Sequence, residues 1–166
     1  MSREQLCADI AAYHEMVYRL AFSCTGNRFD ADDITQDAFM RLYMYKKSFS
    51  SDEHKKAFLI RVTINLFKDM RKSAWFKRRT ELDENIPANG STGDDSKESE
   101  STLCEYILEL KPNYRAVIYL HYYEGYTTAE IARMLKIPES TVTTRLGRAR
   151  SKLKTQIIGN REVFCL

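Results

Sequence analysis

One block, TTAEIARMLKIPESTVTTRLGRARSKLK at residues 127–154, constrains the fold of this chain more than any other feature. Thr127 and Glu130 have the spacing of a capping box, which satisfies free backbone donors at a helix start. Apolar residues then repeat at i and i+4, as on one face of a short helix. Pro138 cannot continue that helix but suits the first turn of another. The block therefore predicts a helix-turn-helix unit.

The second helix of this unit has two contrasting faces. Its apolar side chains form one narrow stripe, as a buried face requires: Val142, Leu146, Ala149, Leu153 and Ile157. The opposite face has small or cationic side chains, which suit a DNA major groove: Ser140, Thr143, Thr144, Gly147, Arg148 and Ser151. The stem of Arg145 is expected to cover the core while its charge reaches a phosphate or water. Solvated surface is the alternative for the threonines and for Arg150, Lys152 and Lys154.

Length and composition narrow the class of protein. The 166 residues allow one domain or two small ones, and 43% hydrophobic residues are enough for real cores. Apolar runs fall short of the roughly 20 residues that span a bilayer, and the N-terminus lacks a secretion signal. We therefore expect a soluble, cytoplasmic protein without membrane insertion.

The reactive side chains do not form a catalytic or metal-binding pattern. Four scattered cysteines and three isolated histidines lack metal-ligand spacing, so we expect no metal and no cofactor. The thiols are expected to be reduced, with redox sensing as the alternative. A nucleophile elbow and a phosphate loop are both missing, which argues against an enzyme.

The net charge of +3 is unevenly distributed. Residues 1–80 hold 15 Lys and Arg against 10 Asp and Glu, residues 81–105 hold 1 against 8, and residues 106–166 hold 10 against 5. The acidic segment has few large apolar side chains, which predicts a disordered or loosely held linker. About 20 residues span at most roughly 65 Å, enough for two basic modules to contact separate sites. A plain tether is the alternative.

The N-terminal module is expected to be helical throughout. Apolar side chains between Leu6 and Cys24 alternate at steps of 4 and 3, and Gly26 with Asn27 provides a stop. Asp30 is expected to cap the second helix. The outward side chains of that helix suit a docking surface, with a plain solvated face as the alternative: Asp33, Gln36, Asp37, Met40, Arg41 and Met44.

A third helix is expected from about His54 to Lys77. Its inner face comprises Leu59, Val62, Thr63, Leu66 and Met70. The opposite stripe combines cations with an amide, which suits phosphate neutralisation plus a base contact: Arg61, Asn65, Lys68 and Lys72. Aromatic and cationic residues at its end, Trp75 to Arg79, either stack on unpaired bases or pack into the module's own core.

In this order the motifs resemble the extracytoplasmic-function group of the sigma-70 family, compact bacterial sigma factors with only region 2 and region 4. DADDITQDAFMRLY at 30–43 is similar to the family's core-polymerase-binding helix, and FLIRVTINLFKDMRK at 58–72 is similar to its segment for the -10 element. Residues 108–154 are similar to its -35 reader. The resemblance implies an all-α chain of two small helical domains joined by a flexible acidic linker: region 2 at 1–80, the linker at 81–101 and region 4 at 102–160.

The resemblance also implies a transcription initiation factor rather than an enzyme. Its partners would be core RNA polymerase, through the beta-prime clamp helices and the beta flap, promoter DNA, and an anti-sigma factor of the kind that many relatives have. The clamp helices would be contacted by Asp33, Gln36, Asp37, Met40 and Arg41. The opened -10 strand would be held by Arg61, Asn65, Lys68 and Lys72, helped by a loop at 47–54 that in relatives receives a flipped base. The acidic linker would thread the polymerase interior, where its charge resembles that of RNA.

For the -35 element the resemblance implies Ser140, Thr143, Thr144, Arg145, Gly147, Arg148 and Arg150, with Arg145 and Arg150 on phosphates. Relatives often have Gly in place of Ser140, and a basic or bulky residue in place of Thr143 or Gly147. Arg148 is therefore the best candidate for a bidentate guanine contact. The alternative function is a stand-alone regulator of the LuxR type, which has a similar final helix. Against it, the N-terminal half has a basic stripe where a sensing domain would have an apolar pocket.

Overall fold

The computed structural model describes residues 2–80 and 101–164, and the side chains of residues 2–74 and 103–158. All regular elements within these residues are helices, which confirms the expected all-α fold. The chain divides into two compact units, Met1–Thr92 and Gly93–Leu166. The expected linker lies outside the described residues except for Ser101, which is the first residue of a helix.

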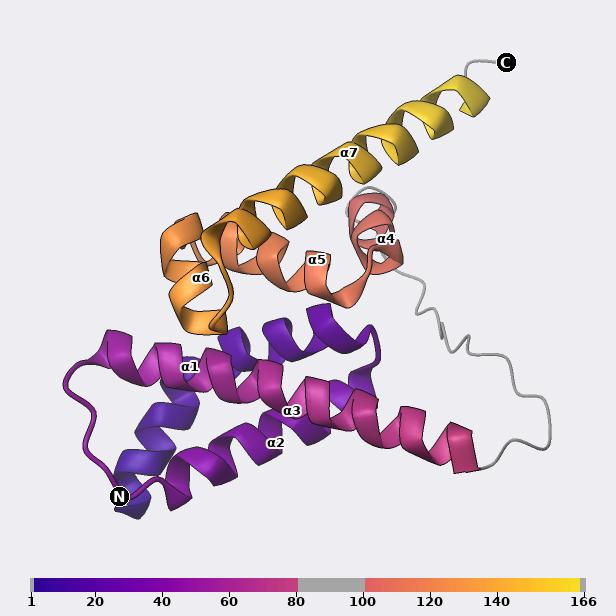
Figure 1. Ribbon diagram of the computed structural model, residues 1–166. Coiled ribbons are helices and arrows are strands. Elements are labelled where there is room, and N and C mark those ends of the chain that lie inside the picture. The colour runs from indigo at the N-terminus through magenta and orange to yellow at the C-terminus, as the bar shows by residue number, and fades with distance from the viewer. Residues whose placement is uncertain (1, 81–100, 165–166) are drawn as a thin grey trace. The chain divides into compact units, whose positions relative to one another are not determined.

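In the first unit, residues 2–80 form three helices that pack on one another (Figure 1): α1 (Arg3–Thr25), α2 (Arg28–Met44) and α3 (Asp52–Thr80). The Ser2 side chain caps α1 by accepting a hydrogen bond from the Gln5 N–H at 3.1 Å. Gly26 ends α1 in the left-handed conformation, with φ of 70°. The predicted stop at Gly26 is therefore confirmed.

The start of α2 differs from the expectation. Asn27 caps this helix, because its Oδ1 accepts hydrogen bonds from Phe29 N at 2.8 Å and Asp30 N at 3.4 Å. Asp30 instead lies in the first turn, where its charge stabilises the helix end. The prediction of Asp30 as the cap was wrong because Asn27, which helps to stop α1, also starts α2.

Helix α3 is buried over a wider face than the predicted stripe. The predicted inner residues are buried, apart from a half-buried Met70, but Ile60, Ile64 and Phe67 are buried as well. This wider burial arises because α1 and α2 both pack on α3. The buried Thr63 hydroxyl is satisfied by donating to the Leu59 carbonyl at 2.8 Å.

A buried ion pair joins α1 to α3. Lys55 Nζ lies 2.7 Å from Asp9 Oδ1, and the two side chains are only 13% and 6% exposed. Gln5 Nε2 donates to the same oxygen at 3.2 Å. The hydrogen bond to Asp9 raises the pKa of Lys55, and burial raises the pKa of the neighbouring Tyr13. The pair connects positions that are 46 residues apart, so no local sequence pattern predicts it.

Between residues 101 and 164, the described part of the second unit, lie four α-helices and one π-helical segment: α4 (Ser101–Glu109), α5 (Pro112–Ile118), η1 (Tyr119–Tyr123), α6 (Thr128–Leu135) and α7 (Glu139–Phe164). Helix α7 packs against α4, α5 and α6 (Figure 1). The core includes Val117, Leu120, Ile131, Val142, Leu146 and Ala149. In η1 the Glu124 N–H donates to the Tyr119 carbonyl at 3.2 Å, as in the wider turn of a π-helix. Tyr122 and Tyr123 of this segment are exposed.

Candidate nucleic-acid interface

The turn between α6 and α7 is held by side-chain hydrogen bonds at both helix starts. The predicted capping box is present: Glu130 N donates to Thr127 Oγ1 at 3.3 Å, and Thr127 N donates to Glu130 Oε2 at 2.8 Å. The bond from the Thr127 N–H lowers the pKa of Glu130. The Thr128 hydroxyl donates to Glu139 Oε1 at 2.6 Å and so ties the start of α6 to the start of α7. These bonds fix the helix-turn-helix geometry that the sequence predicts.

Lys136 closes α6 in an unusual conformation. It adopts φ of 54° and ψ of 48°, the left-handed region that glycine normally occupies at a helix end. Its backbone N–H bonds to the Ala132 carbonyl, which completes the turn. Helix α7 then begins at Glu139, as the position of Pro138 predicts.

The outward face of α7 is open to solvent. Ser140, Thr143, Thr144, Gly147 and Arg148 are all exposed. A Cβ atom added at Gly147 would meet nothing within 4 Å, so this face has room for a close partner. The Thr143 hydroxyl donates to the Glu139 carbonyl at 3.1 Å and keeps only its acceptor capacity for another molecule.

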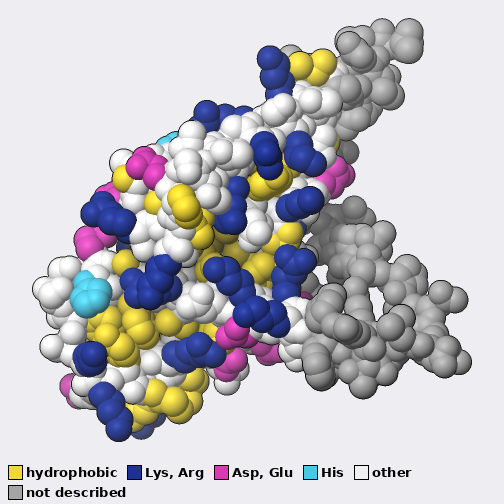
Figure 2. All heavy atoms as spheres, in the orientation of Figure 1, with side chains coloured by type: hydrophobic (Ala, Val, Ile, Leu, Met, Phe, Trp, Pro, Cys, Tyr) yellow, Lys and Arg dark blue, Asp and Glu magenta, His cyan; other side chains and the backbone are white. Residues whose placement is uncertain are grey.

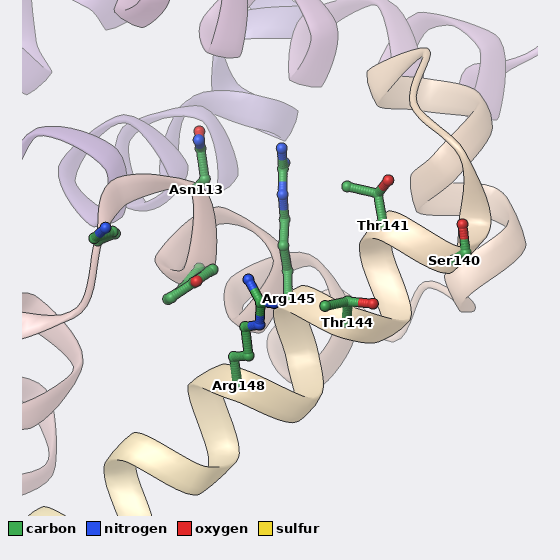
Figure 3. Close-up of a pocket in the computed structure, with 8 residues that line it drawn as sticks. Asn113, Ser140, Thr141, Thr144, Arg145 and Arg148 are labelled. Carbon is green, nitrogen blue, oxygen red and sulfur yellow. The ribbon is translucent and has the colours of Figure 1, made fainter.

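Four of the seven residues predicted for the -35 element line one polar pocket of about 350 Å³: Ser140, Thr144, Arg145 and Arg148. Figure 3 shows Arg145 and Arg148 extending from α7 into the space beside Asn113. The rest of the lining comprises Lys111, Asn113, Tyr114 and Thr141, which sequence reasoning missed. The first three belong to the start of α5, and no periodicity in the sequence places that start beside α7.

Arg150 lies elsewhere. Its guanidinium carbon is 5.8 Å from the centre of the Tyr122 ring, within the range of a cation–π contact. Both residues line an apolar groove of about 550 Å³ between α4, α5, η1 and α7, together with Leu103, Ile107, Ile118, Tyr123, Leu153, Lys154, Ile157 and Ile158. The structure therefore does not bring Arg150 together with Arg145 and Arg148. Figure 2 shows Lys and Arg side chains following α7 over the visible face of this unit.

The stripe predicted for the -10 element follows α3. Asn65, Lys68 and Lys72 are exposed, whereas Arg61 is half-buried and its Nε is buried without a hydrogen bond. The side chains from Trp75 to Arg79 lie outside those that the structure describes.

The segment before α3 forms an aromatic cluster. The Tyr45 ring lies 4.9 Å from Phe49 and 4.5 Å from Phe58, and Phe49 contacts His54 at 5.4 Å. The Ser50 hydroxyl is 3.1 Å from His54 Nδ1. His54 itself lies in the first turn of α3, so the expected loop ends before it.

The side chains predicted to contact polymerase are all exposed along α2: Asp33, Gln36, Asp37, Met40 and Arg41. Met44 is 65% exposed. Two further apolar residues of this helix are exposed and were not predicted from the sequence: Phe29 is 79% exposed and Tyr43 is 48% exposed. An apolar surface rimmed by acids suits a protein partner.

The fold and these surfaces define a class of protein with a helix-turn-helix DNA reader and a second helical unit. Residues 10–77 match the family model for sigma-70 region 2, and residues 103–153 match that for sigma-70 region 4. The ECF RNA polymerase sigma factor SigW of Bacillus subtilis is 33% identical over 164 residues, covering 90% of this chain and 88% of SigW. The ECF RNA polymerase sigma factor SigE of Mycolicibacterium smegmatis is 30% identical, over 87% of this chain and 58% of SigE.

Solved structures have the same fold. The sigma factor RpoE of Bartonella quintana, in its complex with the anti-sigma factor NepR, aligns over 93% of this chain and 97% of its own, with a TM-score of 0.76 and 17% identity. The chain therefore belongs to the extracytoplasmic-function sigma factors of the sigma-70 family. It is a transcription initiation factor and not an enzyme, and this membership replaces the alternative of a stand-alone regulator. Within the described residues, no helix is both long enough and apolar enough to cross a bilayer.

Proposed function

We propose that this chain acts in the cytoplasm, binding core RNA polymerase and directing it to promoters through the -35 and -10 elements. The observation that carries the proposal is that one chain has a region 2 unit and a region 4 unit, each with exposed side chains suited to its partner. The two units would divide the work. One places polymerase on duplex DNA, and the other captures the opened strand.

In this proposal α2 docks on the beta-prime clamp helices. Its exposed acids complement basic side chains of a partner, and Met40 supplies adaptable apolar contact. Phe29 and Tyr43 extend the same contact, because large exposed apolar side chains on one short helix are best explained by a partner that covers them. The beta flap is the second polymerase contact.

Promoter opening is assigned to α3. Asn65 offers both a donor and an acceptor to an unpaired base, and Lys68 and Lys72 neutralise phosphates. Capture of an unstacked base stabilises the melted state because duplex DNA cannot present that base.

Duplex recognition is assigned to α7. Arg148 is exposed on its outward face, and its planar guanidinium can bind O6 and N7 of guanine together. Ser140, Thr143, Thr144 and Gly147 leave room for the groove, while Arg145 neutralises phosphate. Arg150 is assigned a phosphate contact too, although its present position over Tyr122 requires it to swing out of the apolar groove.

An anti-sigma factor is the proposed inhibitor. The solved relative from Bartonella quintana is in complex with one. In this proposal, a similar protein covers surfaces of this chain that polymerase needs. Competition follows directly: a bound inhibitor would lower the fraction of this chain that associates with core polymerase.

The test is reconstitution with bacterial core polymerase. The purified chain is added to core enzyme with fragmented genomic DNA of its host, and transcript starts are mapped. We expect a small set of starts that share -35 and -10 sequences and are absent with core enzyme alone. A chain that binds DNA as a dimer but never associates with core polymerase would overturn the proposal.

A further inference from the structure

The polar pocket beside α7 is lined by residues of a second helix as well as by residues of α7. Three of its eight lining residues come from the start of α5: Lys111, Asn113 and Tyr114. All eight side chains carry hydrogen-bond donors, and none is a carboxylate. A pocket with donors on every lining side chain, three of them cationic, and no carboxylate suits an anionic ligand.

The cations of this pocket have no acidic partner among residues 2–74 and 103–158, whose side chains the structure describes. Lys111, Arg145 and Arg148 form no ion pair with any residue that the structure describes. Lys111 and Arg148 are exposed, and Arg145 is half-buried. Cations clustered without acids repel one another, so an anion that enters between them is bound more strongly than at a single exposed lysine.

The protein holds Lys111 in place. Arg115 is buried, and its Nη1 donates to the Leu108 carbonyl at 2.7 Å, which closes the turn between α4 and α5 around Lys111. Pro112 fixes the first helical residue of α5, and α5 packs on α7. Lys111 and Asn113 are therefore positioned at the edge of α7, where they line the same pocket as Arg145 and Arg148. Figure 3 shows Asn113 beside these two arginines.

We propose that the start of α5 binds one phosphate of the promoter backbone beside the -35 element, with Lys111 as the charged contact and Asn113 as a donor. The inference rests on the proposed function, because it needs α7 to lie in the major groove. It adds a second element to the -35 reader: α7 reads bases, and Lys111 fixes the angle at which α7 enters the groove. Phosphate contacts position a protein on DNA without carrying sequence information.

The test uses holoenzyme, made from the full chain and core polymerase, on a promoter found by the reconstitution above. Binding is measured from about 50 to 200 mM salt for wild type, Lys111→Ala and Lys111→Arg. We expect Lys111→Ala to weaken binding several-fold on promoters with intact or altered -35 bases alike, and to reduce the log–log salt slope by about one. Lys111→Arg retains the charge and should bind within about twofold of wild type.

A second arm locates the phosphate. Neutral methylphosphonates replace single phosphates beside the -35 element. At one position the replacement should weaken wild-type holoenzyme several-fold but leave Lys111→Ala holoenzyme unchanged, since each change removes the same contact. If Lys111→Ala matches wild type in affinity and slope while Arg148→Ala is weakened, the α5 contact is refuted and the proposed function stands. If the chain starts no transcription at all, the proposed function fails.

Discussion

At the scale of single residues, Arg148 and Arg145 show how two neighbouring cations on one helix can have different tasks. Both line the pocket between α5 and α7. Arg148 is exposed on the outward face of α7, whereas Arg145 is half-buried beside the apolar stripe of this helix. A base contact and a phosphate contact respond differently to changes in DNA sequence, so the two assignments can be separated experimentally.

Arg148→Ala should weaken promoter binding by an amount that depends on the identity of one base pair in the -35 element. The loss is expected to be about 1–3 kcal/mol on the preferred promoter and to vanish on a promoter altered at that pair, because the discriminating hydrogen bonds are already gone. Binding of holoenzyme to promoters substituted one pair at a time checks this. Arg145→Ala is the control, with a uniform loss on every promoter. A uniform loss for Arg148→Ala would show that it too contacts only phosphate.

The Asp9–Lys55 pair gives a stability prediction. Lys55→Met should destabilise the first unit by about 3 kcal/mol, because it leaves the Asp9 carboxylate buried with only Gln5 as a donor. Denaturant unfolding measures the change. Asp52→Asn is the control: Asp52 is 88% exposed and 3.9 Å from Lys55, so its loss should change stability by less than about 0.5 kcal/mol.

The same pair predicts a pH dependence. The pKa of Lys55 is raised above its ordinary 10.5, so the ammonium form favours the folded state. This contribution is complete below pH 10.5 and is lost as the pH rises through the raised pKa. Tyr13 acts in the same direction, because its pKa is raised from 10.0. We expect the unfolding free energy to fall above about pH 10, and to fall less steeply in Lys55→Met; equal slopes would contradict the assignment.

At the scale of helices, the start of α2 is set by one side chain. Asn27→Ala should destabilise the first unit by about 1 kcal/mol, because two backbone N–H groups lose their acceptor. Asp30→Ala should cost less, since Asp30 contributes only its charge to the first turn. Thermal unfolding of both variants compares them. A larger loss for Asp30→Ala would restore it as the dominant residue at this helix end.

The helices differ in how far sequence predicts them. The α6–α7 pair was predictable because Thr127, Glu130 and Pro138 each favour one local structure, the start of a helix. The start of α2 was not, because Asn27 and Asp30 are both good caps and only the spacing to α1 decides between them. The pocket was predicted in part: Arg145 and Arg148 lie on α7, whereas Lys111 reaches them only through the packing of α5 on α7. Arg150 has the same charge as Arg148, yet tertiary contacts place it over Tyr122.

At the scale of the whole molecule, the proposed division of work predicts that the two units fail in different ways. Asn65→Ala should lower initiation about tenfold on duplex promoter, because one base contact of the opened strand is lost. On a template whose -10 region is already unpaired by mismatches, most of the activity should return. Arg148→Ala should remain impaired on both templates, since its contact is made with duplex DNA.

In vitro transcription from the two templates checks this prediction. Asp69→Ala is a matched control, an exposed polar residue on the same helix outside the predicted stripe, and should behave like wild type on both. An Asn65→Ala defect that persists unchanged on the mismatched template would assign Asn65 to binding rather than to opening.

The left-handed Lys136 marks a site for thermostable variants. A lysine at φ of 54° is strained where glycine is relaxed, so Lys136→Gly should raise the stability of the second unit by about 0.5–1 kcal/mol, or a few degrees in Tm. Lys136→Ala removes the same charge but retains the strain, and calorimetry of the two variants separates the effects. Equal Tm values would show that the turn is not strained. A laboratory that wants a more robust sigma factor could therefore begin at Lys136, a residue to which the proposed interfaces assign no contact.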